Sequence, residues 1–295
     1  MKHHFGDELD RDGDYWTIVP NRERYAYGID GLPAGDPQVT IATVRSADSL
    51  WRNVFTFPNL EELTLHVPNH EQLEAIAELS KLKRLRITHA KPEQITFLSS
   101  LAQLEELVLE YVSGFSDLSP LRSLRNLKAL HIENLRRVTD FRGLSGLACL
   151  RYLRIDGTLD WKQPIADFEF LRGLPNLEVL SFGQIINKTP YPALLPALAL
   201  ARLKRLKLGW NMLAVEEYAL LEAGLRDVDG ARWGAYTRFE YSPGEEWFQF
   251  TGKGGGRAKC GHPNTEQKCA ERVMKYEKMK AVALRVISGS KDTPQ

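Results

Sequence analysis

Apolar residues recur through the middle of this chain in the order Leu-x-x-Leu-x-Leu, where Ile or Phe sometimes replaces the last leucine. Successive copies start 22, 22, 23, 23, 27 and 26 residues apart. Periods of about 20 to 29 residues are typical of stacked repeat units. Alternating apolar and polar positions predict one short strand per copy. The seven copies begin at Leu60, Leu82, Leu104, Leu127, Leu150, Leu177 and Leu203.

A single copy cannot bury its own apolar side, so each strand should be followed by a turn and a short helix or 3₁₀ segment on the outer face. Stacked copies then form a curved array with a parallel sheet on its concave face. We therefore predict an α/β solenoid. Its expected parts are an N-terminal cap with a degenerate first repeat (1–56), seven repeats (57–212), a C-terminal cap (213–250) and a basic glycine-rich loop with an amphipathic helix (251–295).

The stretch from Phe115 to Leu130, FSDLSPLRSLRNLKAL, resembles the 22/23-residue repeats of phosphatase-regulating and internalin-like leucine-rich-repeat proteins. The resemblance covers roughly residues 57 to 212. It implies a leucine-rich-repeat horseshoe of bacterial style, and the phosphatase regulators imply protein binding inside the cell. Small repeat proteins of this kind serve as toxin-neutralising immunity proteins or as effectors, so the resemblance suggests such a role.

Two sets of positions qualify this resemblance. An aspartate before the outer helical turn can accept backbone N–H bonds there, and it recurs as Asp117, Asp140 and Asp167. The asparagine that the family places three residues after the last apolar strand position is kept only at Asn211. Apolar packing of the turns is expected instead, because the other copies have Ala90, Val112, Leu135, Thr158 and Ile185.

The flanking segments contain further candidate elements. We expect short strands at Tyr15–Val19 and Arg24–Gly28, and a degenerate first repeat from Val39 to Trp51. After the last repeat, a helix is expected at Val215–Leu225. Aromatic strands at Arg238–Tyr241 and Trp247–Phe250 should then close the far end of the solenoid.

The polar positions of each strand should face one open surface, where exposed aromatic and arginine residues are common anchors of protein interfaces. We expect another protein to bind this concave face. The candidate contact residues are Arg84, Arg86, Glu106, Glu110, Tyr111, His131, Glu133, Tyr152, Arg154, Asp156, Arg205, Lys207 and Trp210.

Three carboxylates occupy the same strand position in successive copies: Glu110, Glu133 and Asp156. Like charges on adjacent strands destabilise a sheet, so two interpretations remain open. Arg154, His131 or water could neutralise the row locally. Alternatively, the row forms an acidic ladder that binds a basic patch on a partner, with nearby aromatic side chains supplying apolar contact.

The last segment is basic. Residues 251–295 carry ten Lys and Arg but only four Asp and Glu, so residues 1–250 are left with a net charge of −5. A helix is expected from Thr265 to about Val286, because Cys269, Val273, Tyr276, Met279, Ala283 and Val286 form an apolar stripe at helical spacing. The candidate basic residues are Lys253, Arg257, Lys259, Lys268, Arg272, Lys275 and Lys278.

Three interpretations of this tail stay open. It could be a helix docked on the solenoid by its apolar stripe, with solvated lysines. It could present a basic surface to phosphate, nucleic acid or an acidic protein. A zinc site is a weak third candidate, because Cys260, His262 and Cys269 offer only three donors at a spacing that matches no common finger.

Catalysis has little support, because the sequence has no GxSxG elbow, no HExxH motif and no Cys–His spacing of a nucleophile. We expect no enzyme activity and no cofactor. Three scattered cysteines and no apolar stretch near 18 residues favour a cytoplasmic chain without a membrane span. The sequence does not indicate the oligomeric state.

The predicted function is therefore a non-catalytic scaffold that binds a protein on its concave face. The alternative is a nucleic-acid- or phosphate-associated protein that acts through its basic tail.

Overall fold

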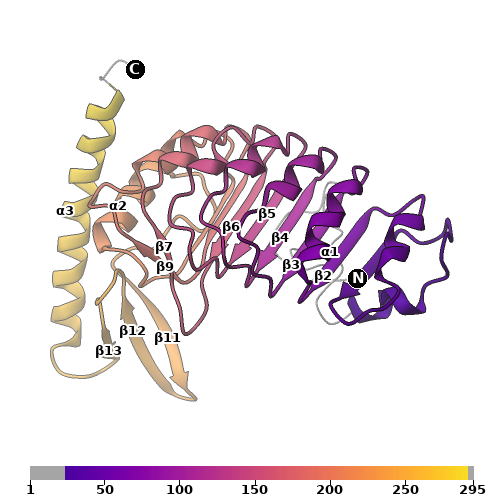
Figure 1. The fold of residues 1–295 in the computed structure, drawn as a ribbon. Helices are drawn as coiled ribbons and strands as arrows, with labels where there is room; N and C mark the ends of the chain where they lie inside the picture. The colour runs from indigo at the N-terminus through magenta and orange to yellow at the C-terminus, as the bar shows by residue number, and fades with distance from the viewer. Residues whose placement is uncertain (1–23, 292–295) are drawn as a thin grey trace.

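A computed structural model of the chain describes residues 24–291. Eight strands form one parallel sheet in the order β1-β2-β3-β4-β5-β6-β8-β10, and short helical segments cover one of its faces (Figure 1). The strands are β1 (Ile41–Arg45), β2 (Glu62–His66), β3 (Arg84–Thr88), β4 (Glu106–Glu110), β5 (Ala129–Glu133), β6 (Tyr152–Asp156), β8 (Val179–Phe182) and β10 (Arg205–Leu208).

Each repeat contributes one strand of this sheet, in the register that the sequence predicts. Leu107 pairs with Leu130, which in turn pairs with Leu153, so equivalent positions of successive repeats lie side by side. The apolar positions are buried, with at most 8% of any of these leucines exposed, and form one continuous core between the sheet and the outer segments. Burial of these leucines is the main stabilising term, about 1.5 to 3 kcal/mol for each side chain.

The outer face is built mostly from 3₁₀ turns. This agrees with the predicted short helix or 3₁₀ segment after each strand. The segments are α1 (His70–Ala75), η4 (Ile76–Glu78), η5 (Thr96–Ser100), η6 (Ser119–Ser123), η7 (Arg142–Leu144), η8 (Glu169–Gly173) and η9 (Leu195–Ala199).

Aspartates fix the start of three of these turns, as predicted. The carboxylate of Asp117 accepts the Ser119 N–H at 2.8 Å. Asp140 and Asp167 bind the N–H two residues later in the same way, at 2.9 and 3.0 Å. Each carboxylate satisfies a backbone donor that a short turn otherwise leaves without a partner.

Four of the five turns after the strands are packed apolarly, as predicted. Ala90, Val112, Leu135 and Ile185 are all at most 2% exposed. Thr158 is the exception, because it is half-buried and its hydroxyl accepts the Trp161 N–H at 3.1 Å. A different set of asparagines links neighbouring repeats: Asn59, Asn126 and Asn176 precede the first leucine of their copies, and each donates to a backbone carbonyl of the previous unit.

Ion pairs run along the second position of the repeats, a feature that we did not predict. Lys83 Nζ lies 2.6 Å from Glu61, and Lys128 Nζ lies 2.7 Å from Glu105. Glu178 lies between two cations, Arg151 at 2.5 Å and Lys204 at 2.9 Å. Because these positions are neighbours in a parallel sheet, opposite charges in successive copies meet directly.

The N-terminal end differs from the prediction at one segment. β1 pairs with β2 in parallel, so the degenerate first repeat is present. Arg24–Gly28, however, is not a strand: Arg24–Tyr27 is a 3₁₀ helix (η1), and only Gly28 bridges to Thr43 of β1. A second 3₁₀ helix, η2 (Ile29–Gly31), follows it, and η3 (Trp51–Thr56) covers β1. The predicted strand at Tyr15–Val19 lies outside the described residues.

The two long repeats use their extra residues for a small second sheet. β7 (Gln163–Ile165) follows β6, β9 (Ile185–Asn187) follows β8, and the two pair in parallel. Gln163 is fully buried; its side-chain amide donates to Val138 O and accepts the Leu135 N–H. The spacings of 27 and 26 residues therefore mark this insertion.

The C-terminal elements lie close to their predicted positions, but it is the helix α2 (Val215–Gly224) that packs against the last repeat, whereas the aromatic strands expected to close the solenoid project from it. This helix is followed by an antiparallel sheet of β11 (Tyr236–Ser242), β12 (Glu245–Phe250) and β13 (Arg257–Lys259). The final helix α3 (Thr265–Lys291) extends beyond its expected end. It stands beside α2, while the hairpin β11–β12 projects from the same end of the array (Figure 1).

Candidate functional site

Most of the predicted contact residues alternate with the buried apolar positions of the strands, so they lie on the sheet face opposite the helical segments. Tyr111 and Trp210 instead follow the ends of β4 and β10. The register brings the acidic row together. Glu110 pairs with Glu133, and Glu133 pairs with Asp156. The three carboxylates therefore occupy neighbouring positions on β4, β5 and β6. Their role in partner binding stays a prediction.

Several of these side chains are less accessible than we expected. Arg86, Glu106, His131 and Tyr152 are at most 1% exposed, although the sequence predicted an open surface. Each is flanked on both sides by side chains of the adjacent strands; His131, for example, pairs with positions on β4 and β6. Others are half-buried, namely Arg84, Glu133, Arg154, Arg205, Lys207 and Trp210.

Basic side chains lie close to each carboxylate of the acidic row. Arg154 lies 2.7 Å from Asp156, His131 Nε2 lies 3.7 Å from Glu133, and Arg86 Nε lies 3.8 Å from Glu110. These contacts favour local neutralisation over an open acidic ladder.

Glu133, in the middle of the row, has a strongly raised pKa. Burial raises its pKa to about 7, and the negative charges of Glu110 and Asp156 add to the rise, although Arg154 opposes it. A carboxyl group with such a pKa exchanges its proton near neutral pH. Glu133 thus loses much of its charge near neutral pH, which weakens the repulsion along the row.

The residue that follows each strand adopts an uncommon backbone conformation in four successive repeats. Val67, His89, Tyr111 and Asn134 have φ angles of 51°, 58°, 56° and 57°. The N–H of each donates to the carbonyl at the end of the next strand, as from Tyr111 to Glu133 O at 2.9 Å. This left-handed conformation costs an ordinary L residue about 1–2 kcal/mol, and it places the side chains in a row along one edge of the sheet.

The aromatic members of this edge row stack on one another. The rings of His89 and Tyr111 are parallel, with an angle of 1° between their planes and 4.9 Å between their centroids. The His66 ring makes an edge-to-face contact with His89, with 5.6 Å between the centroids. Tyr111 remains 41% exposed. Beside this stack is a hollow of about 310 Å³, the edge pocket, which is lined by His89, Lys91, Tyr111, Ser113, Asn134 and Arg136.

The edge pocket combines a planar aromatic surface with two exposed cations, Lys91 and Arg136. Arg136 Nε is held by the side-chain oxygen of Asn134 at 3.4 Å. Of the lining residues, only Tyr111 was among the candidate contact residues, although His89 occupies the same eighth position one copy earlier. The left-handed backbone at this position, which turns both side chains towards the pocket, was not predicted.

A larger hollow, of about 830 Å³, lies where the first strands begin, among residues such as Asn59, Glu61, Lys81 and Lys83. It has no aromatic side chain, and its Glu61 and Lys83 are paired with each other. Since tight interfaces depend on buried aromatic and arginine anchors, the edge pocket is the better candidate.

The basic tail is largely part of the fold. Cys269, Tyr276 and Ala283 are buried on the predicted stripe, but Val273 is 41% exposed, because the buried face of α3 instead includes half-buried Arg272. Arg272 lies over the Phe250 ring at 5.1 Å and donates to Gly255 O.

Two further tail cations have partners. Arg257 donates to Gln249, and Lys259 pairs with Glu245 at 2.6 Å. The remaining candidates are exposed and form no ion pair within residues 24–291; they are Lys253, Lys268, Lys275 and Lys278.

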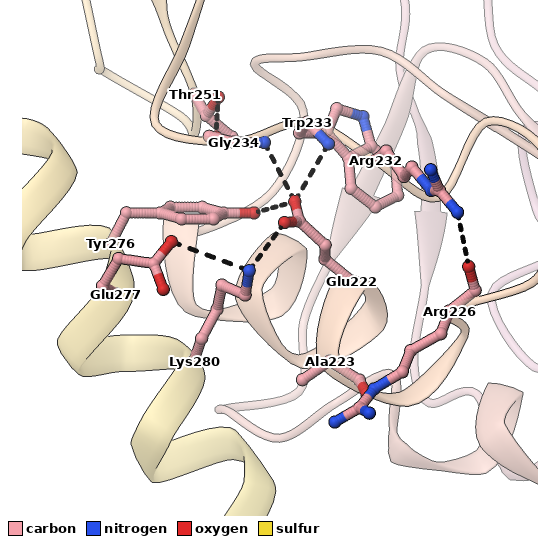
Figure 2. A network of polar contacts seen from close by, with 10 residues as sticks. All are labelled: Glu222, Ala223, Arg226, Arg232, Trp233, Gly234, Thr251, Tyr276, Glu277 and Lys280. Carbon is pink, nitrogen blue, oxygen red and sulfur yellow. Dashed lines mark hydrogen bonds and ion pairs between the residues drawn. The ribbon is translucent and has the colours of Figure 1, made fainter.

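Glu222 of α2 anchors α3 to the rest of the chain (Figure 2). One of its oxygens accepts the N–H groups of Trp233 and Gly234 at 3.0 and 2.9 Å and the Tyr276 hydroxyl at 2.9 Å. The other accepts Lys280 Nζ at 3.0 Å. Burial raises the pKa of Glu222, but these donors together lower it below its ordinary value. These contacts favour the docked-helix interpretation of the tail.

The weak zinc candidate is not supported. Within residues 24–291 no group of three or more His, Cys, Asp or Glu side chains could hold a metal ion. Cys269 instead packs with Phe250 and Ala258, as a small apolar side chain, and His262 Nδ1 lies 2.7 Å from Pro263 O. In the same part of the chain, no helix is long and apolar enough to cross a membrane.

The repeat spacing, the eight-stranded parallel sheet and the outer 3₁₀ turns define a leucine-rich-repeat solenoid. No protein-family model matches the sequence, and neither does any curated protein. Among solved structures, internalin C2 of Listeria monocytogenes is 19% identical, with 57% of this chain and 71% of that protein covered and a TM-score of 0.43.

Two other leucine-rich-repeat structures are similar to part of the chain. Internalin InlF of Listeria monocytogenes is 22% identical, with 64% of this chain and 59% of its own covered and a TM-score of 0.43. A leucine-rich-repeat protein of Leptospira interrogans is 18% identical, with 62% and 46% covered and a TM-score of 0.48. The chain thus spans less than two thirds of these two proteins, and the likeness concerns the fold alone.

Proposed function

We propose that this solenoid is a non-catalytic scaffold that binds another protein along its edge row, with the edge pocket as the centre of contact. The observation that carries the proposal is the exposed, parallel His89–Tyr111 stack beside two exposed cations. A soluble protein gains little stability from an exposed ring pair held on left-handed backbone, whereas a partner would bury it.

The chemistry of the pocket favours a partner segment with an aromatic or other planar side chain next to a carboxylate. The planar group would pack on Tyr111, and the carboxylate would bind Arg136 or Lys91. Aromatic and arginine residues that become fully desolvated contribute most of the energy of an interface, often 2 kcal/mol or more each.

The acidic row would contribute less to binding in this proposal than the sequence suggested. Arg154 and His131 already lie close to its carboxylates, so a basic partner patch would gain less there than the sequence suggested. The suggested immunity or effector role, the cytoplasmic location and the lack of enzyme activity remain predictions from the sequence.

Affinity capture tests the proposal. The intact protein, Tyr111→Ala and Tyr241→Ala would each be used to capture proteins from the native lysate, followed by quantitative mass spectrometry. Tyr241 is a suitable control because it is an exposed tyrosine, at 66%, outside the repeats. We expect a partner that is enriched by the intact protein and by Tyr241→Ala, and lost with Tyr111→Ala; equal recovery by all three would exclude the edge pocket.

A further inference from the structure

The small sheet β11–β12–β13 has two unlike faces. One face packs against α3: Phe250 and Ala258 form a buried cluster with Cys269, and Tyr236 and Phe248 pack around it. Because side chains alternate along a strand, the residues between these point to the opposite side. That second face carries no helix in Figure 1, where the hairpin projects away from the repeats.

The second face is aromatic. Phe239 pairs directly with Trp247 across the hairpin, and the rings of Tyr241 and Trp247 lie 6.3 Å apart. Phe239 and Trp247 are half-buried, and Tyr241 is exposed. We call Phe239, Tyr241, Trp247, Gln249 and Arg257 the aromatic face.

A cation is fixed on this face. The Arg257 guanidinium lies 5.3 Å above the centre of the Phe239 ring, and its Nε donates to the side-chain oxygen of Gln249 at 2.8 Å. Arg257 is exposed and forms no ion pair in the described part of the chain. Its terminal N–H groups are thus positioned beside the rings and remain able to bind an anion.

The small sheet and its connections carry a slight excess of positive charge. Residues 236–259 have four Lys and Arg against three Glu, a net charge of +1. Two of these cations are paired, Arg238 with Glu246 and Lys259 with Glu245. Lys253, by contrast, is exposed on the glycine-rich loop between β12 and β13, so it and Arg257 are the cations available to a polyanion here.

We propose that the aromatic face binds single-stranded nucleic acid. Unpaired bases stack on exposed aromatic rings whatever their sequence, while nearby cations bind the phosphates. Phe239, Tyr241 and Trp247 supply the rings, and Arg257 and Lys253 supply the cations. A duplex keeps its bases stacked inside and offers these rings no base face, so the site selects single strands.

Fluorescence anisotropy of labelled 12-nucleotide mixed-sequence DNA and RNA strands tests this site on the full chain at low salt. We expect both strands to bind, and Tyr241→Ala to weaken binding about tenfold, within the range found when stacking side chains are truncated. Arg257→Gln should weaken binding and reduce its dependence on salt. Leu159→Ala, which alters a 92% exposed side chain on the repeats, should leave binding unchanged.

The outcomes separate the proposal from its alternatives. No binding of either strand at low salt would overturn it, as would equal binding by the intact protein and Tyr241→Ala. Equal competition by an unlabelled duplex of the same length would show that the charged segment, not stacking, holds the strand. Loss of a captured protein with Tyr241→Ala, without any strand binding, would assign the face to a protein instead. Circular dichroism of each variant checks that the fold is retained.

Discussion

At the scale of single residues, the left-handed positions of the edge row set the geometry of the candidate site. Val67, His89, Tyr111 and Asn134 share one backbone conformation because each donates its N–H to the next strand. Asparagine tolerates this conformation, but a β-branched residue does so poorly. Val67 should therefore be the most strained of the four.

Replacing Val67 by asparagine should stabilise the protein by about 1 kcal/mol, because the left-handed conformation costs asparagine less and little apolar burial is lost at 45% exposure. Urea unfolding of the two proteins measures the change. Val282→Asn is the control, since Val282 is similarly exposed but lies within α3. An equal gain in both variants would mean that strain at Val67 is not the cause.

The raised pKa of Glu133 leads to a second prediction for a single residue. The folded protein keeps this proton up to about pH 7, whereas the unfolded chain loses it near pH 4.5. The folded state therefore loses stability as the pH rises between these values and remains penalised above pH 7. Glu133→Gln should stabilise the protein at pH 8, by at most about 3 kcal/mol, and by little at pH 4.

Glu178→Gln should change the folding stability in the opposite direction, so it serves as the matched control. Hydrogen bonds from Arg151 and Lys204 lower the pKa of Glu178, so its charge stabilises the folded state at neutral pH, and that contribution fades in acid. Urea unfolding across pH 4 to 8 should show a gain at high pH for Glu133→Gln and a loss for Glu178→Gln. If the stabilities of the two variants changed with pH in the same way, the raised pKa could not be assigned to Glu133.

At the scale of secondary-structure elements, one side chain connects three parts of the C-terminal end. Glu222 of α2 accepts hydrogen bonds from the loop at Trp233 and Gly234 and from Tyr276 and Lys280 of α3. Removing its carboxylate would leave these donors buried or half-buried without that partner. Each neutral donor left without a partner costs about 1–3 kcal/mol of stability, and a charged donor costs more. These costs are not additive.

Glu222→Ala should thus destabilise the attachment of α3, by about 2–4 kcal/mol, and speed amide exchange in that helix more than in the repeats. Hydrogen–deuterium exchange with mass spectrometry measures this directly. Glu277→Ala is the comparison, because Glu277 is an exposed partner of the same lysine at 3.6 Å. Unchanged exchange in α3 of Glu222→Ala would show that apolar packing alone holds the helix.

The elements also show what the sequence could and could not predict. The leucine period located the strands and their register, because every buried position repeats. It could not identify Arg24–Tyr27 as a 3₁₀ helix, since alternating tyrosines resemble a strand pattern. It also misplaced Val273 on the buried face of α3, where packing against β12 favours Arg272 over the Phe250 ring. The edge pocket depends on the left-handed φ angles of His89, Tyr111 and Asn134, which the pattern of apolar residues does not predict.

At the scale of the whole molecule, the solenoid separates two candidate surfaces. The edge pocket lies on the middle repeats, beyond the C-terminal ends of β3, β4 and β5, and the aromatic face lies on the hairpin beyond the last repeat. They differ in chemistry as well as in place. A protein partner on the repeats and a nucleic acid on the hairpin would therefore respond to different substitutions, and each of the two exposed tyrosines tests one surface.

The most direct test of the central claim is the dissociation constant of the captured protein, measured by isothermal titration calorimetry. The proposal predicts that Tyr111→Ala binds at least tenfold more weakly than the intact protein, a change of about 1.4 kcal/mol, while Tyr241→Ala binds equally well. Equal affinity of the intact protein and Tyr111→Ala would contradict the claim that the edge pocket is the centre of the interface.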